Sequence, residues 1–187
     1  MILSDKDIEK LLAEKKIIVA PLDDNLIGPS GIDLRLDYEM RVFKDIDAEH
    51  LNPFDPESEH ITEIIEPEEG RFIIYPDQLV LASTLEKIEM PDNLVAKLES
   101  RSSLTRLGLI ILGTSGSVEP GFRGHLTIPL MNVGKLPIIL YPEMCFCKLA
   151  FETMSTEAVI PYHARESSKY REQKGPVGSR LYKERKE

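Results

Sequence analysis

Short apolar runs, separated by proline, glycine, asparagine and aspartate, recur along most of this chain. Runs of this length and spacing are typical of the strands of a β-sandwich or barrel. They lie at residues 17–19, 32–36, 72–74, 79–82, 94–98, 109–112, 126–130, 138–140 and 146–151. Thirteen prolines and eleven glycines supply the turns between them. The pattern therefore predicts a mainly β fold.

One helix is predicted before the first of these runs. Ser4 is a favourable N-cap, and Asp5 and Asp7 place negative charge in the first turn, where the helix dipole favours it. Apolar side chains then follow at helical spacing, at Ile8, Leu11 and Leu12. We expect this short N-terminal helix to cover part of the β core.

Two charged segments interrupt or follow the apolar runs. Residues 45–69 are acidic and polar, which indicates a long surface loop or hairpin rather than a second domain. Residues 163–187 are highly charged, and we interpret them as a C-terminal arm that closes over a ligand. A disordered tail is the alternative. The whole chain, residues 1–187, is long enough for one domain with its own core.

Composition narrows the classes of function. The net charge is −9, from 32 acidic and 23 basic residues, which argues against sequence-independent binding of nucleic acid. No apolar run approaches the roughly 20 residues that span a bilayer, and the N-terminus lacks the pattern of a signal peptide. These features predict a cytoplasmic protein without a membrane partner. Residues 101–123 contain three arginines and one acid, so a local pocket for a small anion is compatible with the overall charge.

Cys145 and Cys147 are the only cysteines, and they lie in an apolar, strand-like run. We interpret both as buried, inert thiols. A zinc site needs more ligands than these two cysteines and four scattered histidines offer. Any deamination by this chain is therefore expected to proceed without a metal-bound hydroxide.

Arg101, Ser102, Ser103 and Arg106 form the first candidate cluster. Guanidinium groups match phosphate oxygens in bidentate geometry, and hydroxyls also donate to phosphate. The cluster therefore indicates a phosphate grip at the end of a strand. The alternative is a polar turn that leads into a helix, with a serine as its cap.

A carboxylate follows this cluster, in Glu119-Pro120-Gly121-Phe122-Arg123-Gly124. Pro-Gly predicts a tight turn, so Glu119 is expected at a strand end, where it can orient a water molecule. The alternative is a solvated acid before a hairpin. Asp33 and Arg35 alternate with apolar residues and share one face of a strand, where they form a structural ion pair or help to shape a site.

Residues 99–109, Glu-Ser-Arg-Ser-Ser-Leu-Thr-Arg-Leu-Gly-Leu, resemble the signature of the dCTP deaminase and trimeric dUTPase superfamily. Further segments fit its deaminase branch in the same order along the chain: residues 3–8, 31–36, 118–124, 132–137 and 169–175. The resemblance implies a distorted β-barrel or jelly roll of the dUTPase type. It also implies a homotrimer with active sites between subunits.

The resemblance also implies roles for individual residues. The catalytic group consists of Glu119, Arg106 and Ser102. The substrate contacts come from Arg101, Ser103, Thr114, Ser115, Tyr162, Lys169, Tyr170 and Gln173. The triphosphate is held by Arg101, Ser102, Ser103, Lys169 and Gln173. The tyrosines close over the nucleotide, and the backbone of the hairpin around residues 114–115 reads the pyrimidine. Mg²⁺ is expected to enter with the triphosphate rather than through a protein cage.

Two departures from the family pattern bear on the reaction. Metal-free deaminases carry a proton-shuttling glutamate in the strand before an Asn-x-Gly turn, and here that position is Pro129. Proline cannot transfer a proton, and general acid–base help is typically worth about 10²- to 10⁴-fold. The dUTPases place an aspartate where this chain has Glu119, which keeps the carboxylate with one more methylene. The deaminase-like branch also includes archaeal-type dUTPases that lack the deamination glutamate, and this pattern resembles theirs.

The sequence therefore predicts a hydrolase that converts dUTP and water to dUMP and pyrophosphate. One alternative is dCTP deamination, either to dUTP or, in a bifunctional enzyme, to dUMP. Another is a catalytically silent, nucleotide-binding regulator.

Overall fold

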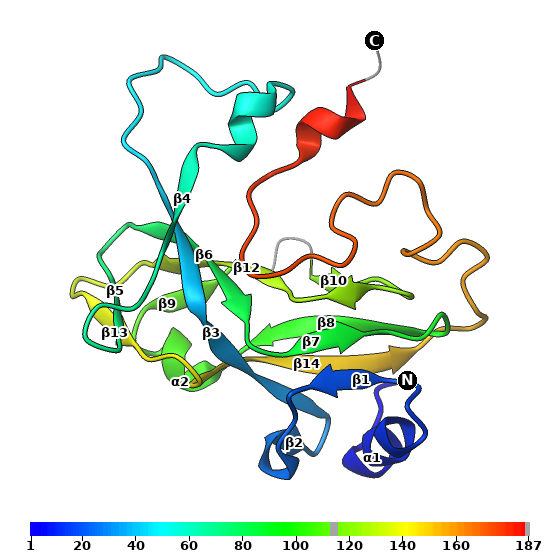
Figure 1. The fold of residues 1–187 in the computed structure, drawn as a ribbon. Helices are drawn as coiled ribbons and strands as arrows, with labels where there is room; N and C mark the ends of the chain where they lie inside the picture. The colour runs from blue at the N-terminus through cyan, green and yellow to red at the C-terminus, as the bar shows by residue number, and fades with distance from the viewer. Residues whose placement is uncertain (113–115, 186–187) are drawn as a thin grey trace.

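Antiparallel strands dominate the computed structural model, which describes residues 1–112 and 116–185 (Figure 1). The largest sheet within these ranges follows the order β10-β8-β14-β3-β6-β12-β9, with β2 and β4 added beside β3. Its strands are β2 (Ile27–Gly28), β3 (Gly31–Phe43), β4 (Thr62–Ile65), β6 (Leu79–Thr84), β8 (Leu94–Ser100), β9 (Leu109–Ile111), β10 (Ser117–Val118), β12 (Thr127–Asn132) and β14 (Cys145–Thr153).

Two smaller sheets complete the β structure of the described residues. One contains β1 (Ile18–Ala20), β7 (Lys87–Glu89) and β11 (Arg123–Gly124), and the other pairs β5 (Phe72–Ile74) with β13 (Ile138–Leu140). The remaining elements are α1 (Asp5–Ala13), η1 (Asp24–Leu26), η2 (Pro56–Glu59), α2 (Ser102–Thr105) and η3 (Leu181–Glu184). None of the described helices is long and apolar enough to cross a membrane.

The long strand β3 gives the main sheet its curl. Its first residues pair with β14, from Ile32 to Arg35, whereas its later residues pair with β6 and β4. The register shifts between Leu36 and Met40. An irregularity of this kind bends a strand and increases its twist, so one strand serves both halves of the curled sheet. Apolar side chains of β3 and β14, among them Leu34, Phe146 and Phe151, are fully buried.

The N-terminal helix has the predicted cap. The Ser4 hydroxyl accepts a hydrogen bond from the Asp7 backbone N–H, and Asp5 and Asp7 lie in the first turn. Ile8 is fully buried, and Leu11 and Leu12 pack against the same core. The predicted mainly β fold with a short N-terminal helix is therefore confirmed.

Each predicted apolar run coincides with a strand, but several strands extend further or were missed. β3 continues to Phe43 because the later part of the strand pairs with β4, which lies inside the acidic stretch 45–69. This stretch is thus the connection of a hairpin, with η2 at its far end. β7, β10 and β11 contain only two or three residues each, too few for a hydrophobic period to show in the sequence.

The C-terminal tail, residues 163–185, crosses the molecule without forming a strand. Gln173 forms an isolated parallel bridge with Gly124, and His125 N–H donates to the Gln173 carbonyl at 3.0 Å. In Figure 1 the tail passes β12 and ends beside the hairpin connection that carries η2. Within the described residues, the tail is therefore packed against the body rather than extended away from it.

Candidate functional site

A cavity of about 750 Å³ lies between the sheet and the C-terminal tail. Its wall is largely apolar, with contributions from Leu81, Leu98, Phe122, Ile128 and Pro129. Polar groups gather at its edge and beneath the tail: Glu119, Thr127, Arg165, Lys169, Tyr170 and Gln173. An apolar cavity of this size with a few convergent polar groups is typical of a small-molecule site.

Glu119 reaches this cavity from the turn that follows β10. Its carbonyl accepts the Phe122 N–H at 3.1 Å, which closes the predicted Pro-Gly turn. Gly121 adopts φ +75°, and a side chain there would meet the His163 ring at 2.6 Å and Pro161 at 2.7 Å. Only glycine fits such a backbone and such a close approach. The turn therefore brings the exposed Glu119 carboxylate beside the start of the tail.

Two tyrosines fasten the tail over the cavity. The Tyr162 ring packs against Phe122, with ring centroids 5.6 Å apart, and its hydroxyl accepts the Tyr170 backbone N–H at 3.2 Å. Burial raises the pKa of Tyr162, so its hydroxyl stays protonated at neutral pH. The Tyr170 hydroxyl accepts the Arg180 backbone N–H at 3.1 Å. Both tyrosines thus lie where the sequence predicts a closing lid.

Gln173 is the most deeply placed of the predicted tail residues, with only 8% of its surface exposed. Its Nε2 donates to the His125 carbonyl at 2.5 Å and to the Thr127 hydroxyl at 3.3 Å. The carbonyl oxygen of His125 can only accept, which fixes the orientation of the amide. Its Oε1 is buried without a partner among the described residues.

The Arg-Ser-Ser cluster lies elsewhere. Arg101 precedes α2 at the end of β8, Ser102 and Ser103 form the exposed first turn of α2, and Arg106 follows its last residue. A short helix does follow this turn, as in the alternative reading, but no serine side chain caps it. None of these four residues lines the cavity, and Figure 1 shows α2 at the end of the fold away from the tail.

Comparison of the chain with known proteins identifies its family. The family model described as dCTP deaminase-like matches residues 2–154. This chain belongs to the dCTP deaminase-like family. Proteins named dCTP deaminase, dUMP-forming, are 44% identical over 97% of this chain in Dictyoglomus thermophilum and 45% identical over 96% in Methanobrevibacter smithii. The match covers 95% of each relative.

A solved structure supports the fold of the family. The dCTP deaminase of Agrobacterium tumefaciens matches with a TM-score of 0.64 at 18% identity. The match covers 82% of this chain and 46% of that one, so this chain spans about half the length of that protein. The predicted superfamily is therefore confirmed. The names of the relatives agree better with the alternative reading, deamination with dUMP formation, than with a plain dUTP hydrolase.

Within this family, the predicted site residues fall into two groups in one chain. Glu119, Tyr162, Lys169, Tyr170 and Gln173 surround the cavity. The second group, at α2, consists of Arg101, Ser102, Ser103 and Arg106. Thr114 and Ser115 lie outside the described residues. Sequence reasoning missed Thr127 and Arg165, which also line the cavity. The alternation along β12 was a usable signal for Thr127, because it shares a face with Pro129.

Pro129 occupies the wall of the cavity. It lies on β12 opposite Leu81, and its carbonyl accepts the Leu112 N–H at 2.9 Å. In an antiparallel strand a residue's nitrogen points to the same side as its carbonyl. The nitrogen without a hydrogen therefore faces the end of β9, and the pairing with β6 is kept. Thr127 and Pro129, the two residues of this face that line the cavity, carry no acid.

Asp33 and Arg35 have different partners rather than each other. Arg101 lies 3.6 Å from Asp33 and also donates to the Cys145 carbonyl at 3.5 Å. Arg35 binds Glu86, with Nε 2.7 Å from Oε1, and Asp23 at 2.8 Å. Burial raises the pKa of Glu86, and the hydrogen bonds from Arg35 oppose this effect. Asp33 thus belongs to the surroundings of the α2 cluster, whereas Arg35 forms a buried structural pair.

The described residues contain no group of three or more histidine, cysteine or acidic side chains placed to hold a metal ion. Burial raises the pKa of the thiols of both Cys145 and Cys147, which keeps them protonated and unreactive. Entry of Mg²⁺ with a triphosphate stays a prediction from the family resemblance.

Proposed function

We propose that this chain hydrolyses dUTP to dUMP and pyrophosphate in the cavity beneath the tail. The observation that carries the proposal is that Glu119 and Pro129 line the same cavity. The carboxylate needed to orient a water is present, whereas β12 offers proline where deamination requires a proton-transferring acid. Relatives named dUMP-forming must remove pyrophosphate as well as ammonia when they start from dCTP. Of these two reactions, the proposal retains the removal of pyrophosphate.

The chemistry follows from the groups at the cavity. The Glu119 carboxylate accepts a hydrogen bond from a water molecule and directs its oxygen at the α-phosphorus. A bond forms between that oxygen and phosphorus, the bond from phosphorus to the α,β-bridging oxygen breaks, and pyrophosphate leaves. The water proton passes to Glu119. Phosphoryl transfer depends mainly on positioning and charge neutralisation. Lys169, whose ammonium group is paired with Glu184 in this structure, would contribute to the latter by exchanging that carboxylate for the triphosphate. Mg²⁺ bound to the triphosphate would supply further neutralisation.

The α2 cluster takes part through a second copy of the chain. In the described structure Ser102, Ser103 and Arg106 are exposed, Arg101 is partly exposed, and none of the four lines the cavity of its own chain. This is expected if active sites lie between the subunits of a homotrimer. Apolar side chains beside α2 are also exposed, with Leu107 at 65%, Val133 at 50% and Leu136 at 77%. Covering these side chains would favour association. We propose that α2 of one subunit completes the cavity of its neighbour.

The second candidate is conversion of dCTP to dUMP. It is favoured by the names of relatives that are 44–45% identical over nearly all of this chain. It requires an acid other than the residue at position 129 to transfer protons at the pyrimidine ring. Glu119 is the acid that lines the main cavity from the body of the fold, and in this candidate it would serve both steps.

One experiment separates the candidates. The purified protein is incubated with Mg²⁺ and either dCTP or dUTP, and pyrophosphate, ammonia and the nucleotide product are measured. Pyrophosphate from dUTP, with no ammonia from dCTP, supports the proposal. Ammonia and dUMP from dCTP establish the second candidate instead. If neither substrate turns over faster than with Glu119→Gln, both candidates fail and the silent regulator remains.

A further inference from the structure

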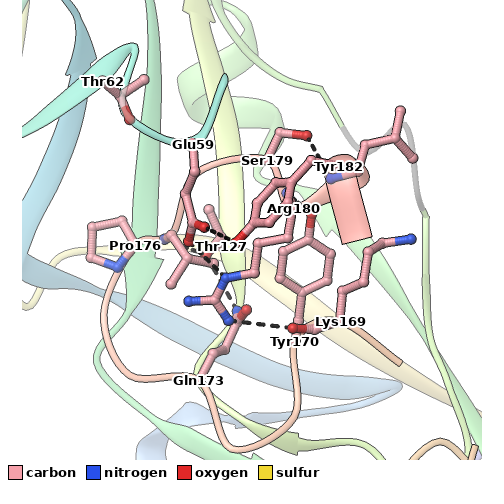
Figure 2. Close-up of polar contacts among 12 residues, drawn as sticks. Glu59, Thr62, Thr127, Lys169, Tyr170, Gln173, Pro176, Ser179, Arg180 and Tyr182 are labelled. Carbon is pink, nitrogen blue, oxygen red and sulfur yellow. Dashed lines mark hydrogen bonds and ion pairs between the residues drawn. The ribbon is translucent and has the colours of Figure 1, made fainter. Parts of the chain in front are cut away.

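The end of the tail is held by one acid from the far end of the β3–β4 hairpin. Glu59, the last residue of η2, accepts hydrogen bonds at both carboxylate oxygens (Figure 2). Arg180 Nε donates to Oε1 at 2.8 Å, and the Tyr182 hydroxyl donates to Oε2 at 2.8 Å. The side chains of Glu59 and Arg180 are only 21% and 25% exposed. These three residues are called the latch below.

Arg180 connects Glu59 to the predicted nucleotide contacts. Its Nη1 donates to the Lys169 carbonyl at 3.3 Å, and its backbone N–H donates to the Tyr170 hydroxyl at 3.1 Å. Figure 2 shows the Arg180 guanidinium between Glu59 and this pair of tail residues. Arg180 thus fixes the backbone at Lys169 and the ring of Tyr170 while Glu59 fixes Arg180.

The same hairpin holds the tail at two further points. Arg41 on β3 donates through Nε to the Pro176 carbonyl at 2.8 Å and through Nη1 to the Thr62 hydroxyl at 3.1 Å. Gly178 packs on the backbone of Glu59, where a side chain would lie 2.7 Å from the Glu59 carbonyl oxygen. The contact is therefore closely fitted along residues 176–182 and does not rest on one ion pair alone.

We infer that the latch formed by Glu59, Arg180 and Tyr182 positions the tail for nucleotide binding, and that the acidic hairpin connection exists in part to receive the tail. Glu59 and Arg180 are positioning residues, because they act through Lys169 and Tyr170. The inference rests on the proposed function in one respect: the nucleotide occupies the cavity beneath the tail.

The test uses the full-length chain and four variants. Glu59→Gln removes the charge at nearly constant size, Arg180→Ala removes its partner, and Gly178→Ala disturbs the same contact without changing charge. Glu57→Gln, an exposed acid of the same turn, is the matched control. Hydrogen exchange of the amides in residues 169–180 is measured without nucleotide. Charge-assisted hydrogen bonds of this kind contribute enough that exchange is expected to rise at least about tenfold in the first three variants, and to stay at the wild-type rate in the control.

A double variant separates the latch from unrelated damage. Glu59→Gln combined with Arg180→Ala is expected to raise exchange by less than the product of the two single effects, because both substitutions remove the Glu59–Arg180 ion pair. Additive effects of the two substitutions would overturn the inference. So would equal tail exchange in Glu59→Gln and Glu57→Gln. Exchange in the amides of β14 serves as the internal standard for global stability.

Nucleotide binding is then measured with a non-hydrolysable dUTP analogue. The latch variants are expected to bind it at least about tenfold more weakly than wild type, with Glu57→Gln unchanged. Unchanged affinity in Glu59→Gln, despite a loosened tail, would overturn the positioning role. If the wild-type protein binds no analogue, the proposed function fails, whereas the exchange results still decide whether the latch exists.

Discussion

Two arginines of this chain, Arg180 in the latch and Arg101 in the α2 cluster, differ in how firmly contacts within the chain hold them. Arg180, in the tail, lies 2.8 Å from Glu59 and is only 25% exposed, and it also binds the Lys169 carbonyl. Arg101, at α2, lies 3.6 Å from Asp33 and is 40% exposed. The short contact to Glu59 and the low exposure of Arg180 suit this arginine to hold structure. An exposed arginine with donors in water is suited to receive an anion.

In the proposed shared site, this difference separates the half that a single chain assembles from the half that a neighbour would supply. The cavity, Glu119 and the tail are assembled by contacts within the chain. The α2 cluster is largely exposed, and its side chains form few contacts with the rest of the chain. In the proposed homotrimer, association of subunits would bring the exposed donors of α2 to the cavity of a neighbouring chain.

The largest expected effect tests whether the two halves belong to different subunits. Glu119→Gln and Arg106→Ala are each expected to lower dUMP formation about 10²- to 10⁴-fold, because one loses the water-orienting acid and the other a cation beside it. When the two inactive variants are unfolded and refolded together, about one quarter of the sites combine an intact Glu119 with an intact α2. Activity should return to that level.

The control for this mixture is each variant refolded alone, which stays inactive. If the mixture remains as inactive as its components, both residues act within one chain and the shared site is wrong. Sedimentation velocity of the same samples reports whether mixed assemblies formed.

A smaller effect, a gain of activity, tests the other side of the cavity. Pro129→Glu places a carboxyl group where the family resemblance puts the proton-shuttling glutamate. We expect ammonia release from dCTP at least about tenfold above that of Pro129→Gln, which has the same length and cannot transfer a proton in this way. Ammonia production is measured by a coupled enzymatic assay. Equal rates in the two variants would show that position 129 does not decide between hydrolysis and deamination.

The sequence was sufficient for those features that depend on local pattern. The nine apolar runs became strands because alternation and turn residues determine strand placement. The Ser4 cap and the buried Ile8 followed from helical spacing. Tyr162, Tyr170 and Gln173 were found at the cavity through the order of family motifs rather than through any local signal.

Other features depend on contacts between distant residues and could not be predicted. Glu59 and Arg180 are 121 residues apart in sequence, and neither segment carries a periodicity that points to the other. The partner of Arg101 proved to be Asp33, on a strand separated from β8 by β14 in the sheet order. Sheet order of this kind follows from the whole topology, so the pairing of these side chains was not visible in sequence.

Acid pH is expected to weaken the tail half of the site. Burial acts to raise the pKa of Glu59, but the hydrogen bonds from Arg180 and Tyr182 outweigh it and hold the pKa below its ordinary value of 4.5. A carboxyl group with a lowered pKa contributes its full stabilisation above the ordinary value and loses it as pH falls through the lowered one. Tail docking should therefore be constant near neutral pH and decline in acid.

Cleavage of the tail by pepsin across the acid range measures this decline. Glu59→Gln provides the control, because its tail is already loosened and should be cleaved with no step in this range beyond the pH dependence of the protease itself. A wild-type profile that parallels the control would show that protonation of Glu59 does not govern docking.

The smallest effect is expected at the α2 half. Asp33→Asn removes the charge beside Arg101, but this pair is partly exposed and its atoms are 3.6 Å apart. Pairs of this kind contribute between about 0 and 1 kcal/mol, so the free energy of unfolding should change by less than about 1 kcal/mol in urea denaturation. Affinity for a triphosphate should stay the same or rise slightly, since Asp33 competes with phosphate for the guanidinium. A loss of stability above about 2 kcal/mol would mean that Arg101 is a structural residue. Arg101 would then not differ from Arg180 in the way described above.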